Sequence, residues 1–139
     1  MDLIRDCLGF RIGSVYRRVD RLFNRAFSPL GLTNAHAQIL LCLLQDGEMR
    51  PVDVAARTGF DPSTVSRLSR ELMRRKLVRR RKDPDDGRAM LLRPAARAET
   101  MREQLARTQE RINGRLRREL ARADLEAFER VTAVMDRLP

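Results

Sequence analysis

The most constraining feature of the sequence is a pair of short helical patterns within residues 51–74, with almost nothing between them. Pro51 stands where a first helical residue is favoured, and Gly59 can adopt the left-handed conformation that ends a helix. Asp61 and Pro62 then supply an N-cap acceptor and a preset first dihedral angle for the next helix. Two helices this close together predict a tight helix-turn-helix.

A change of pattern follows the second of these helices. Leu77 and Val78, and later the apolar run 90–92, flank the polar segment RRRKDPDDGR. This pattern predicts two short antiparallel strands joined by a turn. We expect Arg88 to begin the returning strand and Asp86 to pair with it, which would hold the turn ready. The hairpin would then display its cations beside the helix; a flexible charged loop is the alternative.

Further helices are predicted on both sides of this unit. Apolar residues recur at helical spacing over residues 8–27, and a second pattern runs from an N-cap at Thr33 to Asp46. This second helix is apolar nearly all round, so it should be central. After the hairpin, a helix whose first turn is fixed by Pro94 should extend to about Leu120, and a last helix follows it.

The long helices at the two ends each carry one apolar stripe. No following domain is predicted to cover these stripes, so they must find a partner surface. Pairing with a second copy of the chain would cover them. The alternative is that they fold back on the central helices of the same chain.

Composition narrows the class of partner. The formal net charge is +10 for 139 residues and the sequence pI is about 11.3, which favours a polyanion, because arginines near phosphates gain from counterion release. A merely soluble basic surface is the alternative. With one histidine and two distant cysteines, no nucleophile, base and orienting group can be proposed, so the chain is not expected to be an enzyme.

Cofactors and membranes are not expected either. Cys7 and Cys42 show no metal-ligand spacing and no disulfide framework, which favours a cytoplasmic protein without a metal or cofactor. No run of 18 apolar residues is present, and the first residues lack the apolar core of a signal peptide. We therefore expect no membrane partner.

The second helix of the helix-turn-helix is the predicted reader of nucleic acid. Val65, Leu68 and Leu72 should face inward, which leaves short hydroxyls at the start of the outer face and arginines after them. Such a face suits a major groove, since hydroxyls reach base edges or phosphates and arginine pairs with guanine. An ordinary solvated face is the alternative. The predicted DNA contacts, with those of the hairpin, are Ser63, Thr64, Ser66, Arg67, Arg70, Arg74, Arg80, Lys82 and Arg88.

The runs "LTNAHAQILLCLL" and "DVAARTGFDPSTVSRLSRELMRRKLVRRRKDPDDGRAMLL" resemble the multiple antibiotic resistance regulator (MarR) family of winged helix-turn-helix transcription factors. The motifs cover residues from about 30 to 100, and Asp86 and Arg88 match the D-x-R element of the family's wing. The resemblance implies a mainly α fold with a small β-hairpin wing. It also implies a homodimer, with dimerisation helices in residues 1–30 and 95–139 and a DNA-binding lobe in residues 31–94.

One departure from the family bears on stability. Lys76 stands where the family usually has glycine before the first wing strand. A left-handed dihedral angle at a residue other than glycine costs roughly 1 kcal/mol.

The resemblance also implies two possible sensor chemistries. Cys7 lies near the position of an oxidant-sensing cysteine but out of register with it, so an inert thiol is the alternative. His36, with Tyr16 or Arg11, could contact a small anionic aromatic effector, or it could simply be a partly exposed histidine at a helix start. Cys42 is expected to pack in the core.

The sequence therefore predicts a cytoplasmic regulator that binds double-stranded DNA as a homodimer, most often as a repressor, and that a small molecule could release. The competing hypothesis is a basic architectural or RNA-binding protein that neutralises phosphates without reading bases. A specificity ratio of about a thousand or more for one duplex over random duplex would separate the two.

Overall fold

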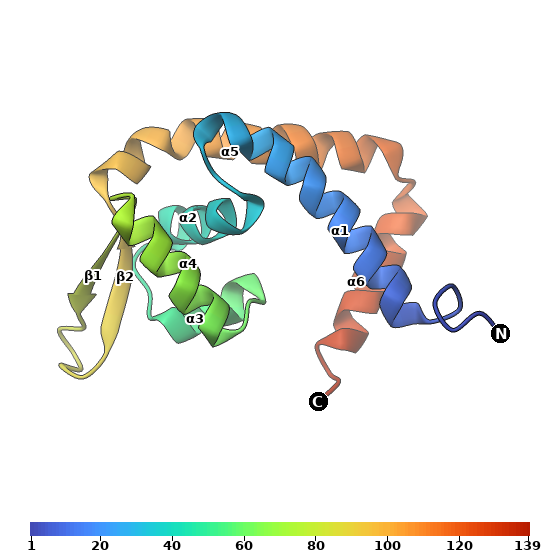
Figure 1. Ribbon diagram of the computed structural model, residues 1–139, viewed down its shortest axis with the longest axis horizontal. Coiled ribbons are helices and arrows are strands. Elements are labelled where there is room, and N and C mark those ends of the chain that lie inside the picture. The colour runs from blue at the N-terminus through green and yellow to red at the C-terminus, as the bar shows by residue number, and fades with distance from the viewer.

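The computed structural model describes all 139 residues and shows a mainly helical chain with one β-hairpin (Figure 1). Its elements, in chain order, are α1 (Leu8–Phe27), a short 3-10 helix η1 (Ser28–Leu30), α2 (Asn34–Asp46), α3 (Pro51–Thr58), α4 (Pro62–Arg74), β1 (Val78–Lys82), β2 (Met90–Pro94), α5 (Ala96–Glu119) and α6 (Arg122–Met135). A compact lobe holds α2, α3, α4 and the hairpin. Helix α5 runs from this lobe toward α6 and both chain ends.

Helix boundaries in the lobe follow the predicted signals. The Thr33 side chain accepts a hydrogen bond from the backbone N–H of His36, and the Asp61 side chain accepts one from that of Thr64, so each satisfies a free donor of the helix it caps. Gly59 ends α3 at φ 78°, in the left-handed region where a side chain would be strained. The predicted helix-turn-helix is therefore confirmed as α3 and α4.

Helix α2 is the centre of the core, as its nearly uniform apolar character predicts. Its Ile39, Leu40 and Leu43 are fully buried and belong to one cluster with Leu72 of α4 and Leu105 of α5. Each such side chain contributes about 1.5 to 3 kcal/mol through removal of apolar surface from water. This packing fixes α4 against α2 and leaves the other face of α4 to solvent.

The hairpin is antiparallel, with Val78 opposite Pro94 and Lys82 opposite Met90. A third stretch of backbone joins it, because Met49 and Leu92 exchange two backbone hydrogen bonds of 3.0 and 2.8 Å. The hairpin is thus tied to the segment between α2 and α3.

Two local predictions about the hairpin and the next helix are wrong. Pro94 is the last residue of β2, and α5 begins only at Ala96, after an N-cap residue, Ala95, whose side chain offers no acceptor. Arg88 lies in the turn, since β2 begins at Met90. The backbone N–H of Ala95 donates to the carbonyl of Leu77. Backbone pairing between the two arms of the hairpin therefore continues one residue beyond Pro94, where the sequence predicts a helix.

A partly buried polar network joins α1 to α2. The backbone N–H of Asn34 donates to Asn24 Oδ1 at 2.7 Å, and the Asn34 side chain donates to Asp20 Oδ1 at 2.8 Å. The Asn24 amide donates to the other Asp20 oxygen, at 2.9 Å. Because Asn34 is only 5% exposed, these bonds satisfy a residue that would otherwise destabilise the junction.

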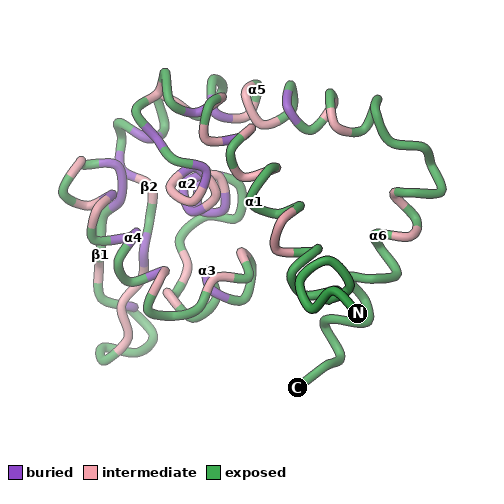
Figure 2. The backbone as a smooth tube through the Cα atoms, turned by 45° about the vertical axis from the view of Figure 1, so that its right-hand side comes forward, coloured by how far each residue is buried: buried purple, intermediate pink, exposed green.

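Exposure divides the molecule into two parts (Figure 2). Buried residues gather in the lobe and along the adjoining stretch of α5, whereas the first half of α1 and all of α6 have none. None of the helices alone has both the length and the apolar composition to span a membrane; α1–η1 and α2 meet these criteria only when joined, across a 73° bend.

Candidate nucleic-acid interface

The outer face of α4 carries the residues predicted to read a groove. Val65, Leu68 and Leu72 are at most 2% exposed and point into the lobe, as predicted. The opposite face is solvent-accessible along its length and presents Ser63, Thr64, Ser66, Arg67, Arg70 and Arg74. Helix α4 is thus packed against the core on one side and accessible to a ligand on the other.

The two hydroxyls at the start of α4 are both bonded to its N-cap residue. Ser63 Oγ donates to Asp61 Oδ1 at 2.5 Å, and Thr64 Oγ1 donates to Asp61 Oδ2 at 2.7 Å. These hydrogen bonds, with that from the Thr64 backbone, hold the pKa of Asp61 well below its usual range. Both hydroxyl protons are therefore in use, and the oxygens face solvent mainly as acceptors.

Arg67 is held from within the lobe. Its Nη1 lies 3.2 Å from Glu71 Oε1, one helical turn further along α4. The second oxygen, Glu71 Oε2, lies 2.7 Å from Nε2 of His36 on α2. The pKa of Glu71 is lowered from its ordinary value, mainly by the hydrogen bond from His36 and then by the Arg67 guanidinium.

A small cavity of about 190 Å³ separates α4 from the hairpin. Ser66 and Arg70 line it from α4 and Arg80 from β1, so two arginine side chains border one space. Ser69, also at its wall, is 3% exposed and its hydroxyl oxygen has no hydrogen-bond partner. The cavity can accept an anionic or hydroxyl-bearing group.

The hairpin presents further cations next to this face. Arg79, Arg80, Lys82 and Arg88 are exposed, and none of them forms an ion pair. Arg81 differs, because its guanidinium is bound by the carboxylate of Glu48, the residue before Met49. This contact lowers the pKa of Glu48 and raises that of Arg81.

The turn of the hairpin is anchored by Asp83, whose side chain is nearly buried. Asp83 Oδ1 accepts the backbone N–H of Asp85 at 2.9 Å, while Oδ2 accepts from Arg50 at the start of α3. These two contacts lower the pKa of Asp83. The sequence predicts Asp83 in the turn but gives no sign of its partner Arg50, because the two residues are 33 positions apart.

The predicted ion pair between Asp86 and Arg88 is replaced by a different contact. Asp86 Oδ1 accepts the backbone N–H of Arg88 at 3.1 Å, and the Arg88 guanidinium remains free. Asp86 thus stabilises the turn by capping a backbone donor, because a carboxylate two residues away reaches the peptide N–H more readily than the end of a long side chain.

The three candidate effector contacts, Arg11, Tyr16 and His36, are not joined by any hydrogen bond. Both ring nitrogens of His36 are occupied, one by Glu71 and the other by Thr33 Oγ1 at 2.9 Å. Tyr16 is 55% exposed on α1. Its pKa is raised, mainly by partial burial and secondarily by the negative charge of Asp20. Arg11 is exposed on the same helix. His36 is therefore a structural link within the lobe.

The two thiols have different surroundings. Cys7 is exposed at the residue before α1. Cys42 is buried on α2, as expected, and its thiol donates to Met49 Sδ at 3.4 Å, while burial raises its pKa and disfavours the thiolate. No group of three or more His, Cys, Asp or Glu side chains is arranged to hold a metal ion.

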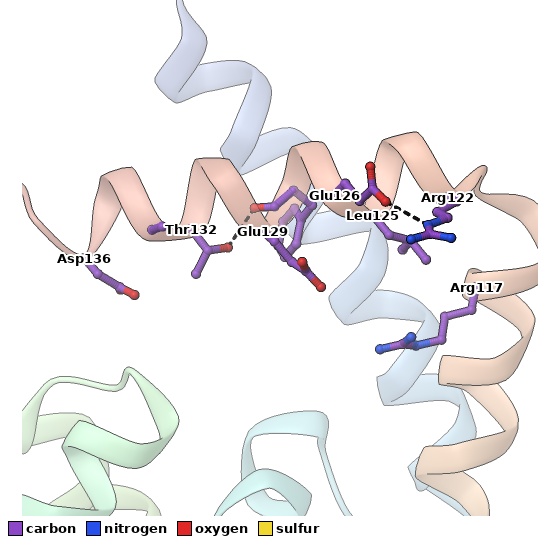
Figure 3. A pocket seen from close by; sticks show the side chains of 9 residues that line it. Arg117, Arg122, Leu125, Glu126, Glu129, Thr132 and Asp136 are labelled. Carbon is purple, nitrogen blue, oxygen red and sulfur yellow. Dashed lines mark hydrogen bonds and ion pairs between the residues drawn. The ribbon is translucent and has the colours of Figure 1, made fainter.

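Large apolar side chains are exposed on the helices near the chain ends. Helix α1 presents Leu8, Phe10, Ile12 and Val15, and α6 presents Phe128, Val131, Val134 and Met135. A hollow of about 720 Å³ lies along α6 and is lined in part by Phe128, with Arg117 reaching in from α5 (Figure 3). Helices α1 and α6 thus expose more large apolar side chains than a solvated helix face needs.

Comparisons with known proteins agree with this geometry. Residues 30–89 match the family model described as MarR family. No curated protein sequence matches the chain significantly. Among solved structures, a mutant MarR from E. coli complexed with operator DNA matches with a TM-score of 0.84 at 23% identity, over 100% of both chains.

Two other solved structures extend the comparison. The apo form of wild-type MarR from E. coli matches with a TM-score of 0.67 at 24% identity, over 96% of this chain and 97% of that one. BpsR of Bordetella bronchiseptica, whose DNA binding is regulated by 6-hydroxynicotinic acid, matches with a TM-score of 0.81 at 26% identity, over 96% of both chains. The helices of this chain are therefore arranged more like those of the operator-bound MarR than of the apo form.

Proposed function

Because the chain belongs to the MarR family of winged helix-turn-helix transcriptional regulators, we propose that it is a sequence-specific double-stranded DNA-binding repressor that acts as a homodimer. The observation that carries this proposal is the outer face of α4. Its arginines and hydroxyls are exposed on a helix that the core holds rigidly, directly beside a cationic hairpin. A helix of this kind fits a major groove, and the hairpin fits the phosphates or the narrow groove next to it.

The positions of the proposed contacts indicate which of them would meet bases and which would meet phosphates. Ser66, Arg67 and Arg70 lie on the middle of α4 and would contact base edges, while Ser63 and Thr64 would accept hydrogen bonds from base amino groups at its start. Arg74 at the end of α4, with Arg80, Lys82 and Arg88 of the hairpin, would pair with phosphates.

A homodimer would be formed by residues 1–30 and 95–139, and residues 31–94 would form the DNA-binding lobe. The exposed apolar side chains of α1 and α6 support this division, since a second copy would cover them. Two copies related by a two-fold axis would present two α4 helices to half-sites about one helical turn apart.

Sedimentation equilibrium tests the dimer. Phe128→Arg places a charge at an exposed apolar position of α6, and we expect it to convert the dimer to a monomer and to weaken operator binding with it. Val52→Arg changes an equally apolar but distant position on α3 and should leave the dimer intact. A wild-type chain that is monomeric at all concentrations would contradict the proposal.

Release by a small anionic aromatic molecule is part of the proposal. Two recognition helices must meet two half-sites together, so a ligand that changes the angle between lobes would weaken both contacts at once. BpsR, whose DNA binding responds to 6-hydroxynicotinic acid, is a precedent for such an effect on a similar arrangement of helices.

The test of function is a comparison of affinities at matched salt. Binding to the best sequence from a randomised duplex pool should exceed binding to random duplex by about a thousandfold or more. Equal affinity for both would favour the second candidate, a basic architectural or RNA-binding protein, which the net charge of +10 alone would also suit.

A further inference from the structure

We propose that Glu71, itself fixed by His36, is a positioning residue that aims the Arg67 guanidinium at base edges and away from phosphates. The inference deepens the proposed function and rests on it. It assigns a specificity-determining role to two side chains that would not contact the DNA themselves.

The geometry is a chain of contacts from the core to the surface. Glu71 uses both carboxylate oxygens, Oε2 toward His36 at 2.7 Å and Oε1 toward Arg67 at 3.2 Å. Exposure rises along the chain, from 13% for the His36 side chain to 29% for Glu71 and 58% for Arg67. The inner end is therefore held by the lobe, and the outer end is free to meet a ligand.

His36 is fixed in its turn by the N-cap of α2. Thr33 Oγ1 lies 2.9 Å from His36 Nδ1 and also accepts the backbone N–H of His36. A neutral ring with its proton on Nε2 satisfies all these contacts, because the Thr33 hydroxyl then donates to Nδ1 and Nε2 donates to Glu71. The ring cannot rotate without breaking a hydrogen bond at each nitrogen.

This anchoring distinguishes the pair from an ordinary pair on a helix surface. Exposed pairs four residues apart hold their side chains only loosely, because both partners are mobile. Arg107 and Glu103 on α5 form such a pair, with both side chains about three-quarters exposed. Glu71 is immobilised by a third residue, so its hold on Arg67 has a fixed direction.

Two consequences follow for DNA binding. Only Nη1 of Arg67 is engaged, so Nε and Nη2 remain as two donors suited to guanine O6 and N7. A carboxylate beside the guanidinium also repels phosphates and reduces the general attraction of this arginine for the backbone. Arg70, which has no ion-pair partner, lacks both effects, so Arg67 is the better candidate for the base reader.

The test is a selection from randomised duplex at fixed salt, followed by affinity measurements on the selected sequence and on random duplex. We expect Glu71→Gln to lower the base preference at one position per half-site about threefold to tenfold. Affinity for random duplex should rise about twofold to threefold, since Arg67 is released toward phosphates. The matched control Glu103→Gln should change neither value.

A double-mutant cycle shows whether Glu71 acts through Arg67. In an Arg67→Ala background, Glu71→Gln should cause no further loss of base preference. His36→Gln, which keeps an amide donor for Glu71, should retain most of the preference that His36→Ala loses, and it provides a second measurement if Glu71→Gln unfolds the lobe. An unchanged preference in Glu71→Gln, or an equal loss with Arg67 absent, would overturn the inference. A wild-type chain that selects no sequence would overturn the proposed function as well.

Discussion

Arg50 donates two hydrogen bonds to one oxygen of Asp83, from Nε at 3.1 Å and from Nη2 at 2.8 Å. Arg50 is the N-cap residue of α3, and Asp83 is the first residue after β1. The pair therefore ties the start of the hairpin turn to the first helix of the helix-turn-helix.

Loosening this pair should weaken DNA binding without unfolding the lobe. We expect Asp83→Asn, which keeps an acceptor for Asp85 but loses the charge facing Arg50, to lower affinity for duplex roughly threefold to tenfold, because the hairpin is no longer held ready. Helical content by circular dichroism should be unchanged. The control is Asp85→Asn, at an exposed turn position two residues after Asp83, and it should have little effect on affinity. Equal losses of affinity in both variants would contradict the role given to the pair of Arg50 and Asp83.

Two arginines should give opposite signatures in DNA binding. Arg67→Ala is expected to relax preference at one base position, since it removes a proposed base contact. Arg88→Ala is expected to weaken binding to all sequences alike and to reduce the slope of log affinity against log salt by about 1. Affinities measured at several salt concentrations on selected and random duplex check both, and unchanged operator affinity in both variants would refute these roles.

The N-cap of α4 should contribute a dependence of stability on pH. Because hydrogen bonds lower the folded-state pKa of Asp61, its stabilising effect is present above the unfolded value of about 3.9 and is lost as pH falls below it. We expect wild type to be more stable than Asp61→Asn at pH 7 and the difference to shrink below about pH 4. Denaturant unfolding at several pH values measures it; a constant difference down to pH 3 would contradict the cap's ionised state.

Lys76 should be a site of stabilisation. It is the only residue other than glycine with a positive φ, at 58°, as the comparison with the family's usual glycine anticipated. Lys76→Gly should raise the free energy of unfolding by roughly 0.5 to 1 kcal/mol, because it relieves left-handed strain. The control Arg74→Gly, within α4, should lower it by a similar amount. A destabilised Lys76→Gly variant would contradict this account.

Local signals in the sequence were sufficient to predict most of the lobe. Thr33, Pro51, Gly59 and Asp61 marked helix ends correctly, because capping depends on residues within one turn of each other. Apolar spacing likewise predicted the buried face of α4. These features depend on residues close together in the sequence, so a single sequence is enough to predict them.

Predictions failed where several local solutions compete. Pro94 is as suitable for the end of a strand as for the first turn of a helix, and pairing with β1 decided between them. Arg88 lies two residues before Met90, where the paired strand begins. Asp86 accepts a hydrogen bond from the backbone N–H of Arg88 and does not pair with its guanidinium. The spacing of the two residues is the same for both contacts, so it cannot distinguish them.

The contacts that hold the interface together could not be predicted at all. Arg50 with Asp83, Glu48 with Arg81, and His36 with Glu71 are 33 to 35 residues apart, and only the packing of α2, α3, α4 and the hairpin brings them together. Their residue types gave no signal, because charged residues are common throughout this chain. For the same reason the sequence leaves His36 open between an effector contact and a partly exposed histidine at a helix start, and gives no sign of its bond to Glu71.

Mapping guanine N7 contacts by methylation interference on the selected duplex tests the central claim most directly, because N7 lies in the major groove. A dimer that reads DNA with α4 predicts two clusters of interference, centred about one helical turn apart on one face of the duplex, and Arg67→Ala should remove one position from each. Absence of interference at guanine N7, interference confined to adenine N3 in the minor groove, or a single cluster unaffected by Arg67→Ala would contradict it.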